Sequence, residues 1–350
     1  MKDIFPEVES RYVDSELIAT NSKKISELSR FFYSAFSFLL ICAGIWIFCF
    51  YANKNLPDIR PGVDVINSAK TDYLKNHLIF SPNKPIKVLV FGDSKVLSGF
   101  IPKQFDHEVH GATSYNVGFG GTSIFIPQLQ KLLCRGVIPT HVLVMVPWFD
   151  SPVEKKSFFH FLPRDEKIIN VLFPFHLLIR NTLVFLLRSK QYGGPLGFYH
   201  YAEAEVENMY RDHGYFFIYD QSRFPNERLP KNFHLESDNS KLIKYRDPDI
   251  NSKAFHKLKD LADQYKFKII VMPYYLRQRE RGQVGINYAM VNALKPYHEF
   301  SVMSKDYFLF HDHYFSDTEH LNPSGAKMYT EIIVNLMKNE LANERKSHVI

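Results

Sequence analysis

The chain has 350 residues, 45% of them hydrophobic and 23% charged, which excludes a disordered protein and allows one large core or two smaller ones. Its formal net charge of +6 is spread along the sequence without long Lys/Arg blocks, so we expect no nucleic-acid partner. Of three cysteines, Cys42 and Cys49 lie in an apolar segment, which leaves Cys134 without an intramolecular disulfide partner in the main domain.

The first predicted element is an apolar helix from Phe31 to Tyr51, with no charged residue. At 1.5 Å per residue this segment would span about 30 Å, the thickness of a bilayer core. It is longer than the apolar part of a typical signal peptide, and no small-x-small cleavage site precedes Asn53. We therefore expect an uncleaved, single-pass anchor in the cell (inner) membrane.

The charges beside this segment predict its orientation. Lys23, Lys24 and Arg30 precede it closely, whereas Lys54 and Arg60 follow it. This slight positive-inside bias places residues 1–30 in the cytoplasm and the main domain in the periplasm or outside the cell.

Residues 52–85 hold four prolines around one helical candidate, Val63 to Asn76, and we expect a stalk there. From residue 86 to about 345, apolar strands alternate with helices, which predicts a mainly parallel sheet covered on both sides. The expected strands are 87–91, 114–117, 141–146, 267–272 and, more weakly, 307–310. The expected helices are 124–134, 252–265, 288–299 and 324–341.

An aromatic-rich insertion at 151–245 interrupts this alternation. Its apolar stretch 168–187 contains Pro174, His176 and Arg180. An arginine near the centre of a membrane span costs ~2.5–3.5 kcal/mol even on the most lenient scale. We therefore expect 168–187 to cover the domain or lie at the membrane interface, not to form a second span.

Two separated motifs carry residues suited to nucleophilic catalysis. Gly92-Asp93-Ser94 follows the first strand, and Asp317-x-x-His320-Leu321-Asn322 precedes the last helix. Side chains three residues apart on a turn can face the same side. An imidazole that accepts a serine proton, oriented by a carboxylate, is the arrangement that serine nucleophiles require.

Together with the glycine loop "YNVGFGGTS" (115–123), these motifs resemble those of the SGNH/GDSL hydrolase superfamily. The resemblance implies a flavodoxin-like three-layer α/β/α fold with about five parallel strands, preceded here by one transmembrane helix. It also implies that Ser94 is the nucleophile, His320 the general base and Asp317 its orienting partner. The N–H groups of Ser94 and Gly121 would contribute to the oxyanion hole.

One family block departs from the pattern. After its third strand the family has Gly-x-Asn-Asp, whose Asn donates to the oxyanion, whereas here "VPWFD" puts Phe149 at that position. Losing one such donor typically costs ~10²–10³ in rate. Either backbone donors suffice, another side chain such as Asn116 or Trp148 replaces the Asn, or the site is impaired.

Further residues are candidates for substrate contact. They are Asp150, next to Phe149, and Arg277 and Arg279, which follow the fourth expected strand. Open α/β sheets bind ligands at the carboxyl ends of their strands, so these arginines are candidates for an anionic substrate. His311 and His313 lack a third ligand of suitable spacing, so we expect no metal and no cofactor.

Membrane-tethered proteins of this family, such as alginate O-acetylation and teichoic-acid D-alanyl transfer proteins, modify envelope polymers. The resemblance therefore implies an esterase or O-acyltransferase that uses an acyl-Ser94 intermediate. Its partners would be an acyl donor, an envelope glycan acceptor and a membrane-bound acyltransferase. Two alternatives stay open: a non-catalytic envelope assembly protein that keeps the fold, and a membrane-tethered lipase or esterase.

Overall fold

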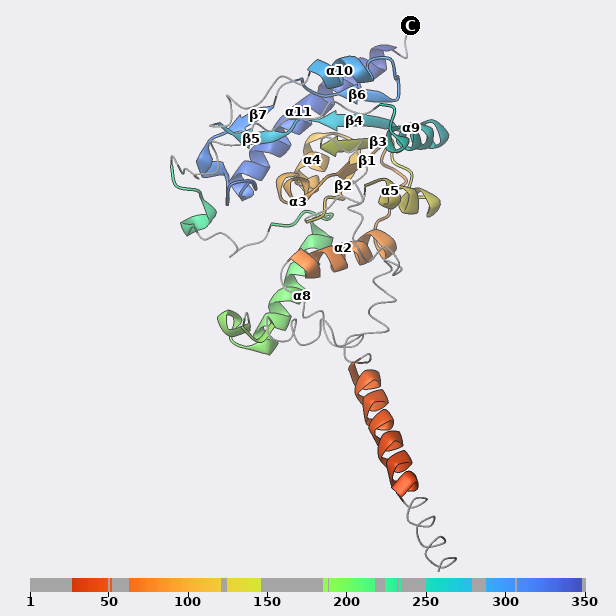
Figure 1. Ribbon diagram of the computed structural model, residues 1–350. Coiled ribbons are helices and arrows are strands. Elements are labelled where there is room, and N and C mark those ends of the chain that lie inside the picture. The colour runs from red at the N-terminus through yellow and green to blue at the C-terminus, as the bar shows by residue number, and fades with distance from the viewer. Residues whose placement is uncertain are drawn as a thin grey trace, which may run out of the picture. The chain divides into compact units, whose positions relative to one another are not determined.

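The computed structural model describes the part of the chain that carries the two motifs (Figure 1). The chain divides into two compact units, Met1–Ile59 with Ser157–Leu187 and Arg60–Lys156 with Arg188–Ile350. The described residues are 27–49, 51, 63–120, 125–145, 185–187, 189–217, 224–231, 233, 250–278, 288–305 and 307–347.

The first unit contains one long apolar helix, Glu27–Cys49, of 23 residues. Its large side chains, such as Phe31, Phe36 and Leu39, are exposed. At 1.5 Å per residue the helix is about 35 Å long, enough to cross a bilayer core. The helix begins four residues before the expected Phe31. Its length and composition suit a membrane span and equally a signal sequence.

The second unit is built on a five-stranded sheet in which all neighbours are parallel, in the order β2-β1-β3-β4-β6. This confirms the predicted α/β class with five parallel strands. The strands are β1 (Ile86–Phe91), β2 (Ala112–Asn116), β3 (His141–Met145), β4 (Lys268–Met272) and β6 (Phe300–Val302).

The identity of the fifth strand differs from the prediction. The segment expected at 307–310 contains β7 (Phe308–Phe310), but β7 pairs in parallel with β5 (Tyr275–Arg277) in a separate two-stranded sheet. The fifth place in the main sheet belongs to β6, a three-residue strand with a serine at its centre. An edge strand of this length gives too short an apolar run to be recognised in the sequence.

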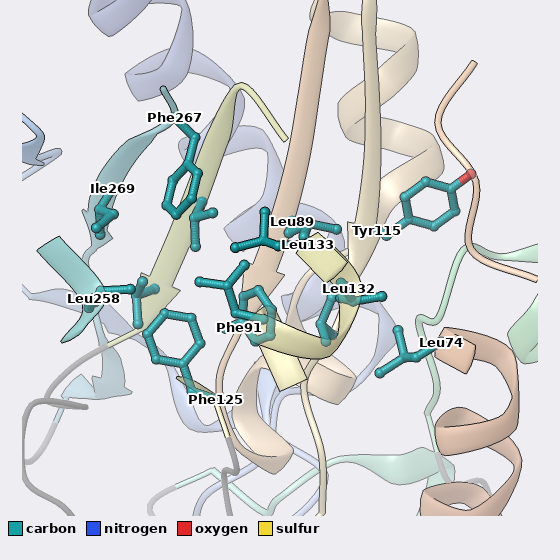
Figure 2. Close-up of a cluster of buried hydrophobic side chains, with 14 of the residues drawn as sticks. Leu74, Leu89, Phe91, Tyr115, Phe125, Leu132, Leu133, Leu258, Phe267 and Ile269 are labelled. Carbon is teal, nitrogen blue, oxygen red and sulfur yellow. The ribbon is translucent and has the colours of Figure 1, made fainter. Parts of the chain in front are cut away.

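Helices cover both faces of the main sheet, as the alternation of its side chains shows. Leu89 and Phe91 of β1 belong to one buried cluster, whereas Val88 and Val90 belong to the other. Figure 2 shows the first cluster, where Phe91 lies near Phe125, Leu132 and Leu133. This face is covered by α5 (Phe125–Cys134) and α9 (Lys253–Tyr265), and the opposite face by α4 (Pro102–Glu108) and α11 (Pro323–Ser347).

The remaining described helices connect or extend these layers. The expected helix to Glu299 ends at Leu294, and a turn closed by the Tyr297 N–H and the Leu294 carbonyl leads into β6. The helices that connect or extend the layers are α2 (Val63–Asn76), α3 (Ser94–Gly99), α8 (Pro195–Arg211) and α10 (Tyr288–Leu294).

Helix α2 has the predicted bounds but a different role from a stalk. Its residues Ile66, Tyr73 and Leu74 are buried in the first cluster. The hydroxyl of Tyr210 on α8 donates to the Ala69 carbonyl at 3.3 Å and to the Asp72 carboxylate at 3.1 Å. The described part of the expected stalk is therefore packed into the domain, and α8 of the insertion contacts it.

Candidate functional site

Ser94 lies where β1 turns into α3. Gly92 is required at this turn because a Cβ atom there would collide with the side chain of Val96. Asp93 caps α3, its carboxylate accepting the Lys95 N–H at 2.8 Å. Ser94 is the first helical residue and is partly exposed at the carboxyl end of β1. Within the described ranges its own N–H has no acceptor.

Asp317 and His320 form a compact unit just before α11. One oxygen of Asp317 accepts the N–H groups of Glu319 and His320, both at 2.7 Å. The other oxygen accepts from His320 Nδ1, also at 2.7 Å. An antiparallel bridge between Phe315 and Leu321 closes the turn. The three-residue spacing thus brings carboxylate and imidazole together, as the sequence predicts.

The structure brings this unit to Ser94, 226 residues earlier, with 2.7 Å between His320 Nε2 and Ser94 Oγ. A carboxylate only accepts, so the proton of the neutral imidazole sits on Nδ1. Nε2 is then the acceptor for the Ser94 hydroxyl. The three side chains form one directed chain of hydrogen bonds that can remove the serine proton.

The electrostatics of Asp317 suit this role. Burial raises the pKa of its carboxyl, but the hydrogen bond and charge of His320 and the two backbone N–H groups outweigh it and hold the pKa below its usual value of 3.8. Asp317 therefore stays ionised at neutral pH and favours an imidazolium next to it.

Helix α11 fixes the Asp317–His320 unit against α3. The Thr330 hydroxyl accepts the Ile101 N–H at 3.0 Å and donates to the Gly99 carbonyl at 3.4 Å. Before α11, the buried Asn322 amide donates to the carbonyls of His313 at 2.8 Å and Glu227 at 3.1 Å. Asn322 belongs to the predicted motif, but its anchoring role has no sequence signal because Glu227 lies in the insertion.

Asn116 was expected either to replace the missing oxyanion Asn or to contact a substrate, but its amide is engaged inside the protein. It is fully buried, and its amide nitrogen donates to three carbonyls on and after α3. The distances are 2.7 Å to Val96, 3.2 Å to Leu97 and 2.8 Å to Phe100. Both amide protons are thus used inside the protein, where they hold α3 against β2.

The structure also contradicts the expected substrate contact of Arg277. It is buried, its Nε donates to the Asp312 carboxylate at 2.9 Å, and a terminal nitrogen donates to the Phe233 carbonyl at 2.6 Å. The sequence made it a candidate for contact with an anionic substrate after the fourth strand, but it is the last residue of β5, which pairs with β7. A guanidinium so engaged is not available for an anionic substrate. The expected contacts at Gly121, Trp148, Asp150 and Arg279, and also Phe149, lie outside the described residues.

One group of side chains in the described ranges has the spacing of metal ligands. The ligand atoms of Asp263, His298 and Glu299 lie within 4.8 Å of one another. However, Lys259 Nζ lies 2.6 Å from Asp263 and 3.1 Å from Glu299, so an ammonium group already pairs with both carboxylates. The rings of His311 and His313 stack at 5.8 Å.

Comparison of the chain with protein-family models, curated proteins and solved structures gives no match. The functional argument therefore depends on the geometry of Ser94, His320 and Asp317 and on the sequence motifs that contain them.

Proposed function

We propose that the chain is a membrane-anchored serine esterase or O-acyltransferase of the SGNH/GDSL type, with a flavodoxin-like three-layer fold. The observation that carries the proposal is the continuous hydrogen-bonded chain from Ser94 through His320 to Asp317, with 2.7 Å at each step. It lies at the carboxyl edge of a parallel sheet, where open α/β sheets bind ligands.

The proposed reaction has two steps. In the first, Ser94 Oγ attacks the acyl carbonyl carbon while its proton passes to His320 Nε2. The tetrahedral intermediate then collapses, the leaving alcohol takes the proton from His320, and acyl-Ser94 remains. In the second, a glycan hydroxyl or water attacks the acyl carbon, His320 takes its proton, and this proton returns to Ser94 as the ester breaks.

The N–H of Ser94, which has no acceptor in the described part of the chain, is one proposed donor to the oxyanion. Gly121, next to the described Gly120, is the second. Phe149 offers no side-chain donor, so the proposed site depends on backbone groups.

The anchor helix supports an envelope location for the substrate. With residues 1–30 in the cytoplasm, the domain faces the periplasm or the exterior, where an acyl donor, a glycan acceptor and a membrane-bound acyltransferase would be its partners. A tethered lipase would instead act on lipid esters with no glycan present.

A covalent probe tests the proposal. The full chain in detergent should be labelled by a fluorophosphonate or activated acyl ester, and Ser94→Ala should not be labelled. Ser98→Ala is the matched control, because Ser98 lies on the same helix and its hydroxyl donates to the Ser94 carbonyl at 2.9 Å, away from the imidazole. Equal labelling of wild type and Ser94→Ala would exclude Ser94 as the nucleophile.

Phe149 favours one second candidate, a non-catalytic envelope assembly protein that keeps the fold. If the full chain resists every probe while Ser94→Ala retains biological function in cells, this candidate replaces the enzyme.

A further inference from the structure

We infer that helix α2 is a positioning element of the site: Asn67 clamps the glycine loop, and Lys70 secures the hydrogen-bond network behind Ser94. The inference rests on the proposed function. The two residues are three positions apart, so they share one face of α2.

Asn67 makes a reciprocal pair of hydrogen bonds with the backbone of Gly120. Its amide nitrogen donates to the Gly120 carbonyl at 3.0 Å, and its side-chain oxygen accepts the Gly120 N–H at 3.0 Å. The Gly120 N–H and the Gly120 carbonyl belong to consecutive peptide groups, so one amide side chain holds the backbone on both sides of the Gly120 Cα. The peptide group that contains the Gly120 carbonyl also carries the Gly121 N–H, the proposed second donor to the oxyanion.

The same loop is tied to the turn that holds the nucleophile. The N–H of Phe119 donates to the Gly92 carbonyl at 3.1 Å, two residues before Ser94. The N–H of Gly118 donates to the Asn116 side chain at 3.0 Å. Asn67 therefore holds the outer end of a loop whose inner end is fixed to β1 and β2.

Lys70 contacts Asn116, the residue to which this loop is tied through the Gly118 N–H. It is fully buried, and its ammonium donates to the Gly214 carbonyl at 2.7 Å and to the Asn116 side chain at 3.3 Å. Asn116 in turn donates to the carbonyls of Val96, Leu97 and Phe100. Lys70 thus supports the residue that holds α3, whose first residue is Ser94.

This arrangement costs stability. No carboxylate pairs with Lys70 among the described residues, and burial lowers the pKa of its amine well below 10.5. A methionine would fill the same space without burying a cation. The contact with Asn116 gives the lysine a role that packing alone does not require.

The experiment compares Asn67→Ala with Asn76→Ala, the same substitution at an exposed position of the same helix, in the full chain in detergent. Steady-state hydrolysis of p-nitrophenyl acetate is normalised to sites titrated to completion with a fluorophosphonate, so unfolded protein does not count. Displacing a catalytic group by about 1 Å costs up to ~10²-fold in rate. We therefore expect kcat per titrated site to fall roughly 10- to 100-fold in Asn67→Ala, with little change in KM.

Amide hydrogen exchange gives a readout that needs no activity. Asn67→Ala should speed exchange in the peptide that contains Val117 to Gly120, whereas Asn76→Ala should not. Lys70→Met is the second variant, with a smaller expected loss of kcat and faster exchange in α3.

The outcomes separate the two proposals. If wild type is labelled through Ser94, but kcat per site and exchange are unchanged in both Asn67→Ala and Lys70→Met, the positioning role of α2 is wrong. If wild type is not labelled through Ser94, the proposed enzyme fails. The exchange comparison then still decides whether α2 holds the loop and α3.

Discussion

At the scale of single residues, the proposed base and its orienting group are assembled locally, and the proposed nucleophile is brought to them by the fold. Asp317 gives one carboxylate oxygen to two backbone N–H groups and the other to the imidazole of His320. Its own position is therefore fixed independently of Ser94. It orients the ring so that Nε2, and not Nδ1, meets the serine hydroxyl.

The variant Asp317→Asn tests this orientation. An amide in place of the carboxylate can donate to Nδ1, which reverses the tautomer and leaves Nε2 protonated toward Ser94. We expect kcat for acyl-ester hydrolysis to fall by about 10³- to 10⁴-fold at neutral pH, with folding intact. Stopped-flow acylation measures the loss, and far-UV circular dichroism checks the fold. A loss below tenfold would show that His320 does not depend on Asp317.

At the scale of elements, α11 is joined to α3 near one end and to the sheet near the other. Near its beginning Thr330 joins it to the segment after α3, and near its end Glu344 lies 3.3 Å from His141 of β3 and 3.1 Å from Lys268 of β4. Lys268 also pairs with Glu340 at 2.7 Å. Since α11 begins three residues after His320, these contacts support the position of the imidazole from the opposite end of the helix.

The pairing of Glu344 with His141 and Lys268 predicts that the folded domain loses stability in acid. Burial raises the pKa of its carboxyl, but the hydrogen bonds and charges of His141 and Lys268 prevail and lower it from 4.5 to about 2. A folded-state pKa below the unfolded value stabilises the protein above pH 4.5, and this contribution is lost as pH falls toward 2. At about 1.4 kcal/mol per pKa unit, the contribution is roughly 3 kcal/mol.

Glu344→Gln should therefore show a smaller loss of unfolding free energy between pH 6 and pH 3 than the wild type. Urea titrations of the full chain in detergent measure this difference. Glu331→Gln, at an exposed position of the same helix, should keep the wild-type slope. Parallel slopes for wild type and Glu344→Gln would contradict the assignment.

Features encoded by neighbouring residues could be predicted from the sequence, whereas contacts between distant residues could not. Gly92-Asp93-Ser94 and Asp317-x-x-His320 are each encoded within four residues, so their geometry was predictable. Lys70 was not, because a lysine on an amphipathic helix is usually solvated and its acceptors lie 46 and 144 residues away. Arg277 was misassigned for the same reason, since the pairing of β5 with β7 that buries it leaves no mark on nearby sequence.

At the scale of the whole molecule, the positions of the cysteines allow the proposed membrane topology to be tested. Cys42 and Cys49 lie in the long apolar helix, whereas Cys134 is exposed at the end of α5. A single accessible thiol outside that helix distinguishes the two sides of a membrane. If the helix spans the bilayer as proposed, the other two thiols are out of reach of a charged reagent.

A membrane-impermeant maleimide should label the chain in cells whose inner membrane is intact and whose outer layers are permeabilised. Cys134→Ser should abolish the labelling. Mass measurement of the modified peptide identifies the thiol. Labelling that requires disruption of the inner membrane would put the domain in the cytoplasm and overturn the proposed topology.

The separation of Ser94 from His320 also has a consequence for biogenesis. During synthesis the serine emerges long before the histidine, which follows it by 226 positions. If the proposed function and topology hold, Ser94 has no base until α11 has docked, and the growing chain would not attack acyl esters in the cytoplasm. In the proposed enzyme, folding of the C-terminal part of the domain would then itself switch the chemistry on.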